Sequence, residues 1–348
     1  MSKVIVINAT KGRKLLWRRI KIRKSLDSIC HTMELEIPSS ECENVQKHDK
    51  IEVRYENAHI TDSRGRRRVT TVMVDEITSS ADVSNNSAVV LGRSPARDII
   101  DSTWSGSVWP GEARNNTLAF ATSYIAGRFG IESGWFPNDP EDPTSSVGYF
   151  SWHNESPWVR LLTEAANQGF IITSNEAGAL FIWQVPEESS VRREGFLIDE
   201  GKNVRSIEWR ANGAEQFHEY VVLRNFDKAV VIDDTCNTNR TLTIDLTGFS
   251  FLRENIQRRA LTEMRRRREN RITVTVSGWG LTDSQIKYLG DTNGMELFWS
   301  PNFMIPVRMP SLRLPASLNN LLIAEVEQEA NTETMQSTIT LVNREAYL

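Results

Sequence analysis

The sequence predicts an α+β protein that is mainly β, with two related antiparallel β-barrel-like domains flanking an α+β module. Apolar and polar residues alternate with a period of two in the first 93 residues and again after residue 203. That period is typical of strands with one buried and one solvated face. Helix signals concentrate between these regions, and a short β motif recurs in both of them. We therefore expect three domains, at 1–93, 94–186 and 187–348.

The first domain is predicted to be β throughout. Residues 32–37 and 51–55 each alternate apolar with polar side chains. Two further strands are expected at 69–77 and 88–91, with a polar connection between them. This pattern is typical of antiparallel sheets and small barrels that bury one face.

Capping residues define the middle module. Ser94 and Ser156 each precede a proline, and a serine cap followed by proline marks the start of a helix. Gly130 and Gly169 are suited to end helices, because glycine readily adopts the left-handed conformation there. The expected elements are helices at 94–101, 116–129 and 156–168 and a hairpin at 170–173 and 179–184.

The third domain is predicted to be β with one Arg-rich helix, near residues 251–268. Apolar residues recur there every fourth position, which places them in one stripe on a helix; they are Leu252, Ile256, Ala260 and Met264. The expected strands cover 203–210, 219–225, 241–245, 272–277, 304–307, 321–327 and 337–342.

A faint internal repeat relates the first and third domains. Residues 50–54 are echoed by residues 304–308, and each copy is followed by a strand, a polar loop and a second strand. Two positions align at one constant offset, namely Glu76 with Glu325 and Ala81 with Ala330. Such a repeat fits two related β domains on either side of an insertion.

Positive charge is concentrated in two runs, although the formal net charge is −4. Residues 1–24 hold nine Lys or Arg and no acid, which leaves −13 for the remainder. A second run covers 253–271. Both runs are interrupted by apolar residues at regular intervals, so the simpler interpretation is a solvated face of an amphipathic element. The alternative is contact with an acidic partner surface, for which the candidates are Arg18, Arg19, Arg265, Arg266, Arg267 and Arg268.

The sequence predicts no catalytic residue, metal site or cofactor. The five histidines lack metal-ligand spacing, and no phosphate-binding or nucleophile motif is present. The three cysteines are too few and too scattered for a disulfide framework. No apolar run reaches the length of a membrane span. Tryptophans in predicted loops, including Trp109 and Trp135, are candidate anchors for a protein partner, although core packing is the usual role of an aromatic residue.

Several segments, in order, resemble phage baseplate hub proteins. The similarity is to hubs of the phage Mu type, described as 43 kDa tail proteins, and more distantly to the T-even hub and the N-terminal part of the type VI spike protein VgrG. The segments are LGRSPARDIID at 91–101, NTL at 116–118, 125–131, ESPW at 155–158, QGF at 168–170 and FWSPN at 298–302. The motif positions that we single out are Gly92, Arg93, Ser156, Trp158, Trp299, Pro301 and Asn302.

The resemblance implies a structural, non-enzymatic role in a contractile tail of a phage or prophage. Similar hubs are ring-shaped homotrimers in which two barrel-like domains per chain match a hexameric tail tube above and a trimeric spike below. The implied partners are a second and third copy, the tail tube protein, the central spike protein and baseplate wedge proteins. DNA would pass through the channel without specific binding. Synthesis in the bacterial cytoplasm and a place in the virion baseplate follow from the same resemblance.

Two other functions remain open at this point. A nucleic-acid-binding protein could use the basic runs at 11–24 and 253–271, and would lose affinity steeply with added salt. A tail-associated cell-wall hydrolase would need a positioned pair of carboxylates.

Overall fold

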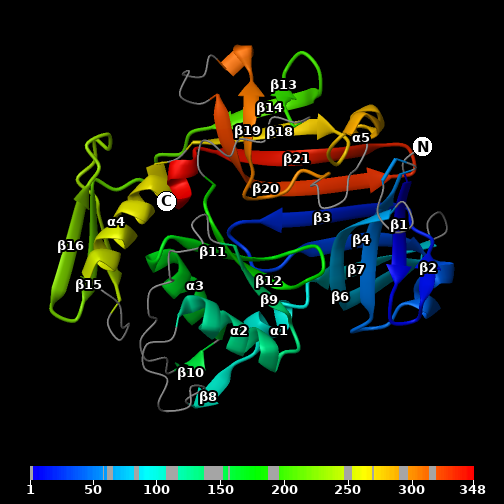
Figure 1. The fold of residues 1–348 in the computed structure, drawn as a ribbon, viewed down its shortest axis with the longest axis horizontal. Helices are drawn as coiled ribbons and strands as arrows, with labels where there is room; N and C mark the ends of the chain where they lie inside the picture. The colour runs from blue at the N-terminus through cyan, green and yellow to red at the C-terminus, as the bar shows by residue number, and fades with distance from the viewer. Residues whose placement is uncertain are drawn as a thin grey trace.

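The computed structural model shows two β lobes that share one large sheet, with a helical module beneath them (Figure 1). We call the strands from β1 to β7 lobe 1, and the strands β13, β14 and β18 to β21 lobe 2. The described residues are 3–57, 59–60, 66–81, 86–106, 117–136, 152–155, 157–186, 196–246, 253–268, 270–289, 297–312 and 319–348.

Lobe 1 contains seven strands and a short 3-10 helix. The strands are β1 (Lys3–Asn8), β2 (Arg13–Leu15), β3 (Arg19–Ser25), β4 (Thr32–Pro38), β5 (Lys50–Glu56), β6 (Arg66–Ala81) and β7 (Asn86–Arg93), with the 3-10 helix at Ser39–Asn44. Lobe 2 contains β13 (Ile198–Asp199), β14 (Val204–Arg210), β18 (Arg271–Ser277), α5 (Asp283–Leu289), β19 (Met304–Arg308), β20 (Asn320–Asn331) and β21 (Met335–Val342), with 3-10 turns at Pro310–Leu312 and Arg344–Tyr347.

The α+β module follows lobe 1, and an outer layer is inserted into lobe 2. The module contains α1 (Arg97–Asp101), β8 (Trp104–Gly106), α2 (Leu118–Arg128), β9 (Ser133–Phe136), β10 (Trp152–Glu155), α3 (Pro157–Asn167), β11 (Phe170–Ser174) and β12 (Leu180–Gln184). The insert contains β15 (Glu219–Arg224), β16 (Asp227–Ile232), β17 (Thr241–Asp245) and α4 (Arg253–Arg268).

The large sheet has the order β14-β18-β21-β20-β3-β4-β7-β6-β5-β1-β2, with β19 and β13 attached beside β20. Strand β3 of lobe 1 therefore lies directly against β20 of lobe 2 (Figure 1). One apolar core extends under both lobes, from Val6 and Ile20 in lobe 1 to Val326 and Leu341 in lobe 2. The sheet and the apolar core both continue across the boundary between the lobes. The domain limits expected from the sequence, at 1–93, 94–186 and 187–348, stay a prediction.

The two lobes have the same strand pairing, residue for residue, in their central hairpins. Hairpin β6–β7 and hairpin β20–β21 correspond at an offset of 249, and each carries a β-bulge at the same place, between residues 74 and 76 and between 323 and 325. Ile51 lies opposite Val72, and its equivalent Ile305 lies opposite Leu321. The internal repeat expected from sequence is confirmed by this register.

The correspondence extends to the next two strands. Met33 of β4 pairs with Gly92, as Ile272 of β18 pairs with Leu341. Strand β3 pairs with β4 in the register in which β14 pairs with β18, so that Ile22 of β3 corresponds to Trp209 of β14. The lobes differ at their other end, where β1 is antiparallel to β5 but β13 is parallel to β19.

The helices follow from their capping residues and apolar faces. The hydroxyl of Thr117 accepts a hydrogen bond from the backbone N–H of Phe120, as expected for the cap of α2. Gly130 and Gly169 both adopt positive φ after their helices. The stripe on α4 packs Ile256 and Ala260 against the insert strands, while Leu252 lies outside the described residues. The α+β, mainly β class is confirmed.

Some details differ from the sequence prediction. The first helix starts at Arg97 rather than Ser94, because residues 94–96 form a turn before it. The hairpin strand β16 was not predicted; Asn225, at φ 49°, makes the tight turn that leads into it. The first basic run agrees with its strand-like pattern, because residues 13–15 and 19–25 form strands β2 and β3 with Ile20 and Ile22 on the buried face. In the part of the chain that the structure describes, no helix is long and apolar enough to cross a bilayer.

Candidate functional site

The junction between the two lobes is the first candidate interface. Three basic residues of β3 face three glutamates of β20 along its solvated side. The nitrogen–oxygen distances are 2.7 Å for Arg19 with Glu329, 2.9 Å for Lys21 with Glu327 and 2.8 Å for Arg23 with Glu325. The other side of β3 buries Ile20 and Ile22 completely. Much of the first basic run is therefore matched by acids of the same chain.

Electrostatics at this seam favour the charged forms. Burial raises the pKa of Glu329, but hydrogen bonds from Arg19 and Gln336 outweigh it and hold the pKa below its usual range. The hydrogen bond to Glu329 likewise raises the pKa of Arg19. These groups are a quarter to a half exposed, so each pair contributes little by itself, about 0.2–1 kcal/mol.

A second junction joins lobe 1 to the α+β module. Arg93 donates from Nε to Asp75, 2.7 Å away, and from Nη2 to Asp101, 2.6 Å away. Asp75 is the bulge residue of β6, and buried Arg97 of α1 also contacts its carboxylate. Hydrogen bonds from Arg93 lower the pKa of Asp101. Arg93 and Arg97 thus join the bulged strand β6 to helix α1.

Gly92 allows this close packing. A Cβ at this position would lie 2.8 Å from the carbonyl oxygen of Met73 on the neighbouring strand. The motif positions Gly92 and Arg93 therefore have structural roles where lobe 1 meets the module.

A third junction joins lobe 2 to the module. Asn302 has a φ of 67°, in the left-handed region that asparagine tolerates. Its Nδ2 donates a hydrogen bond to the carbonyl oxygen of Gln184, 3.1 Å away. Trp299 is buried and meets Phe196 edge to face, with the ring centroids 5.0 Å apart. Pro301 lines a cavity of about 250 Å³ beside them.

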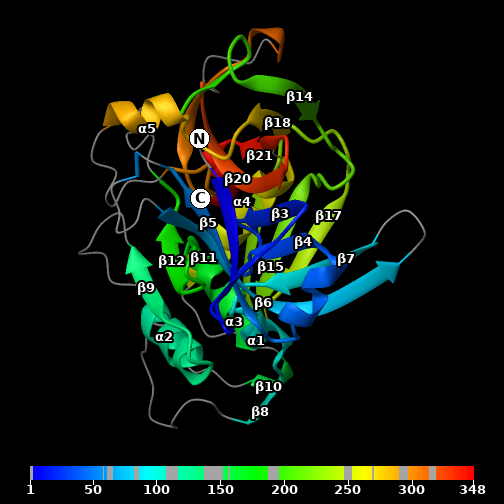
Figure 2. The same cartoon turned by 90° about the vertical axis from the view of Figure 1, so that its right-hand side faces the viewer.

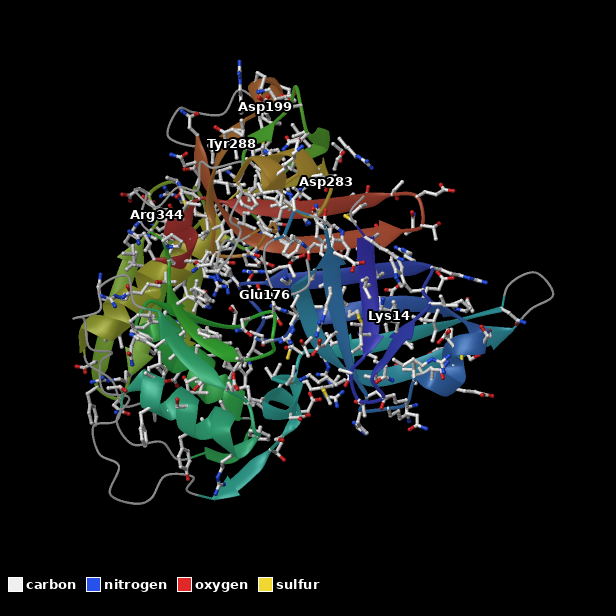
Figure 3. All side chains as sticks on the ribbon, turned by 45° about the vertical axis from the view of Figure 1, so that its right-hand side comes forward. Lys14, Glu176, Asp199, Asp283, Tyr288 and Arg344 are labelled. Carbon is white, nitrogen blue, oxygen red and sulfur yellow. The ribbon has the colours of Figure 1, made fainter. Side chains whose placement is uncertain are left out.

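That cavity lies where both lobes meet the module, and Glu176 marks its position in Figure 3. Its walls include the buried residues Lys24 and His31. Burial, together with the charge of Lys24, lowers the pKa of His31 to about 3. His31 is therefore neutral at physiological pH and is positioned beside the hydroxyl of Thr70, 3.2 Å away.

The Arg-rich helix α4 is attached to the rest of the chain by its last turns. Arg265 donates to the carbonyl of Leu348, 3.3 Å away, and Arg266 contacts Asp27 and stacks over the Tyr347 ring at 5.0 Å. Arg267 donates to Glu263 within the helix, 3.2 Å away. Arg268 is exposed.

The remaining candidates are placed as follows. Arg18 lies 3.9 Å from Glu36 of β4. Trp135 packs against Phe170 in the module core, with the ring centroids 4.9 Å apart, and Trp158 is buried in the same core. Trp109 and Ser156 lie outside the described residues. The described candidates do not converge on one site; they are spread over the three junctions, strands β2 to β4, helix α4 and the module core.

Sequence reasoning missed the acids that face the first basic run. A signal was available, because Glu325, Glu327 and Glu329 alternate and so share one face of a strand. Their distance along the chain from β3 hid the match. Within the described ranges, no group of three potential metal ligands comes together.

The chain is similar over its full length to phage and prophage tail proteins. It is 22% identical to the baseplate hub protein gp44 of Escherichia phage Mu, over all of this chain and 90% of that protein. The 43 kDa tail protein of prophage MuSo2 from Shewanella oneidensis has 22% identity and a TM-score of 0.74, with 99% of this chain and 98% of that chain covered. No family model matches.

Two further structures extend the similarity. The tail protein of Neisseria meningitidis MC58 has 15% identity and a TM-score of 0.76, with 99% of this chain and 98% of that chain covered. The E. coli c3393 protein, a type VI secretion component described as similar to the T4 tail proteins gp27 and gp5, has 10% identity and a TM-score of 0.54 over 98% of this chain and 76% of that one. The resemblance to Mu-type hubs and to their more distant relatives, seen in the sequence, is confirmed. At these identities the solved structures establish a shared fold.

Proposed function

We propose that this chain is the structural hub of a contractile-tail baseplate, working as a ring-shaped homotrimer. The observation that carries the proposal is the end-to-end similarity to the hub gp44 of phage Mu, with 90% of that protein covered. The matching strand registers of lobes 1 and 2 support it independently.

The two equivalent lobes explain why a trimer suits this role. Three chains with two similar lobes each present six similar positions around one axis, while the complete chain repeats only three times. A ring of this kind can join a hexameric tail tube to a trimeric central spike. Tube, spike and baseplate wedge proteins are accordingly its proposed partners, in the virion tail, after synthesis in the bacterial cytoplasm.

The proposed role is non-enzymatic, and DNA would traverse the ring without sequence recognition. The first basic run supports the structural role over specific nucleic-acid binding, because its residues Arg19, Lys21 and Arg23 form ion pairs with glutamates at the seam. These glutamates offset the positive charge that would otherwise attract phosphate groups. The similarity to tail proteins does not favour the cell-wall hydrolase either.

Sedimentation velocity of the purified full chain tests the proposal. A trimer of the 39.6 kDa chain is expected, with its population rising with concentration. A species that stays monomeric or dimeric at every concentration, and with tail tube protein added, would overturn the proposed hub. Measurements on duplex DNA at low salt provide the comparison: tight binding there would favour the nucleic-acid function instead.

A further inference from the structure

A buried lysine lies without a partner where the two lobes meet the module. The side chains of Ile20, Ile22 and Lys24 alternate onto the inner face of β3, so Lys24 occupies a position whose neighbours on that face are apolar. Lys24 is 2% exposed, and its amino group has no hydrogen-bond partner among the described residues. The basic side chains on the outer face of β3, in contrast, are matched by the glutamates of the seam.

A buried charge of this kind calls for a partner. Taking an ammonium group out of water is costly unless the group is paired, and an unpaired one in a folded protein indicates a bound water or ion. The internal repeat does not require the charge, because the residue of lobe 2 that corresponds to Lys24 is Ala211. Burial and the nearby charge of Lys24 together lower the pKa of His31, which keeps that ring neutral. An anion is therefore the partner that suits Lys24.

The cavity of about 250 Å³ at this junction has room for such a partner, and Lys24 forms part of its wall. Aromatic side chains of the module and of lobe 2 form another part; they are Phe181, Trp183 and Phe303. These rings are partly exposed, so one side of the cavity faces solvent. Since one water molecule takes up about 30 Å³ of the liquid, the volume suits a small organic molecule better than a single ion.

We propose that this cavity binds a small carboxylate with a flat apolar body, of the size of benzoate. The carboxylate pairs with the amino group of Lys24, and the body lies against the three aromatic side chains. The amino group is shielded from solvent in the present conformation, and its flexible four-carbon stem allows it to turn toward the ligand. This inference does not depend on the proposed trimer.

The polar groups in the wall orient the ligand. Glu176, labelled in Figure 3, belongs to the turn between β11 and β12 on the module side, whereas Lys24 belongs to the large sheet. The carboxylate of Glu176 repels an anion, so the charged end of the ligand is directed toward Lys24. Asn302, also in the wall, has an Oδ1 without a hydrogen-bond partner, which can accept a bond from a hydroxyl group on the ligand.

Titration calorimetry of the full chain with benzoate and with benzamide tests the proposal. Benzamide has the shape of benzoate without its charge, so benzoate should bind the natural chain about tenfold more tightly or better. Lys24→Met keeps an unbranched stem without the charge. This variant should weaken benzoate binding about tenfold or more and leave benzamide binding within about twofold.

Lys21→Met is the matched control, because Lys21 lies on the outer face of the same strand, where it pairs with Glu327. Its affinity for benzoate should stay within about twofold of the natural chain. Benzoate should also raise the thermal unfolding temperature of the natural chain and of Lys21→Met, but not that of Lys24→Met. Circular dichroism checks that both variants are folded.

The proposal has several ways to fail. Equal affinities for benzoate and benzamide, benzoate binding that Lys24→Met leaves unchanged, or no binding of benzoate at millimolar concentration would each overturn it. Binding of inorganic phosphate in place of benzoate, lost in Lys24→Met, would overturn the carboxylate as the ligand class. The oligomeric state tests the proposed hub and these titrations test the cavity, so a failure of one is distinguishable from a failure of the other.

Discussion

Lobe 1 and lobe 2 share a sheet but differ in what joins their equivalent strands. In lobe 1, β3 and β4 are joined by residues 26–31, whereas in lobe 2 the equivalent β14 and β18 are joined by residues 211–270. That insert folds as β15, β16, β17 and α4, and Arg266 of α4 contacts Asp27 in the short connection of lobe 1.

This difference explains how one chain could present six similar positions in a ring that has only threefold symmetry. The repeated part is the sheet, which provides equivalent positions from both lobes. The parts present once per chain are the insert and the α+β module, which can distinguish one lobe from the other. In our proposal the repeated lobes supply the six similar positions, and the single-copy parts repeat only three times around the axis.

The largest expected effect is the difference in the free energy of unfolding between substitutions at the equivalent residues Ile22 and Trp209. Ile22→Ala should lower the free energy of unfolding by about 2–5 kcal/mol, because it empties a fully buried site. Trp209→Ala should change it by less than about 1 kcal/mol in dilute, monomeric protein, where this side chain is half exposed. Urea unfolding at low protein concentration measures both; equal losses would contradict the assignment of β14 as an open edge.

A pH series probes the junction where His31 is buried; the equivalent position in lobe 2 is Asn270, which is exposed. Because its pKa falls to about 3 in the fold, from about 6.5 when unfolded, the unfolded state binds the proton first as pH falls. Stability should be fully present above pH 6.5 and decline towards pH 3, by about 2 kcal/mol at pH 5.

The variant His31→Gln should reduce this slope between pH 7 and pH 5. His59→Gln is the control, because His59 is exposed. An unchanged slope in His31→Gln, measured by urea unfolding at each pH, would show that His31 is not the group responsible.

Gly92 offers a smaller test, since its equivalent in lobe 2 is Leu341. Gly92→Ala should destabilise the chain by about 1–2 kcal/mol, because its Cβ meets the backbone of Met73. Gly127→Ala, in open space on α2, should be neutral or stabilising by up to about 1 kcal/mol. Thermal unfolding of the two variants checks this; equal shifts would argue against a packing constraint at Gly92.

The smallest effect concerns the charges along the seam. Replacing Glu325, Glu327 and Glu329 together by glutamine should cost about 1–2 kcal/mol at low salt, because the pairs are partly exposed. The loss should shrink in 1 M salt, where exposed charges are screened. A loss that is independent of salt would point to packing rather than to ion pairing.

The sequence predicted local structure well, because its signals lie within a few residues of one another. Short windows of the sequence contain the signals for the helix cap at Thr117, for the positive-φ glycines 130 and 169 and for the register of the repeat. The fold class and the resemblance to tail hubs followed from these windows and their order.

The seam and the role of α4 could not be predicted in this way. Arg19 meets Glu329 across 310 positions, and Arg266 meets Asp27 across 239. Which strand edges meet depends on the completed sheet, not on the local pattern. Trp135, a candidate partner anchor, is partly buried against the module core, and its role in an interface stays a prediction.

Electron cryomicroscopy of the assembled chain tests the central claim most directly. The account predicts a threefold ring in which lobes 1 and 2 of the three copies occupy six similar positions around one axis. An assembly without threefold symmetry, or a ring in which lobe 1 and lobe 2 occupy dissimilar positions, would contradict it.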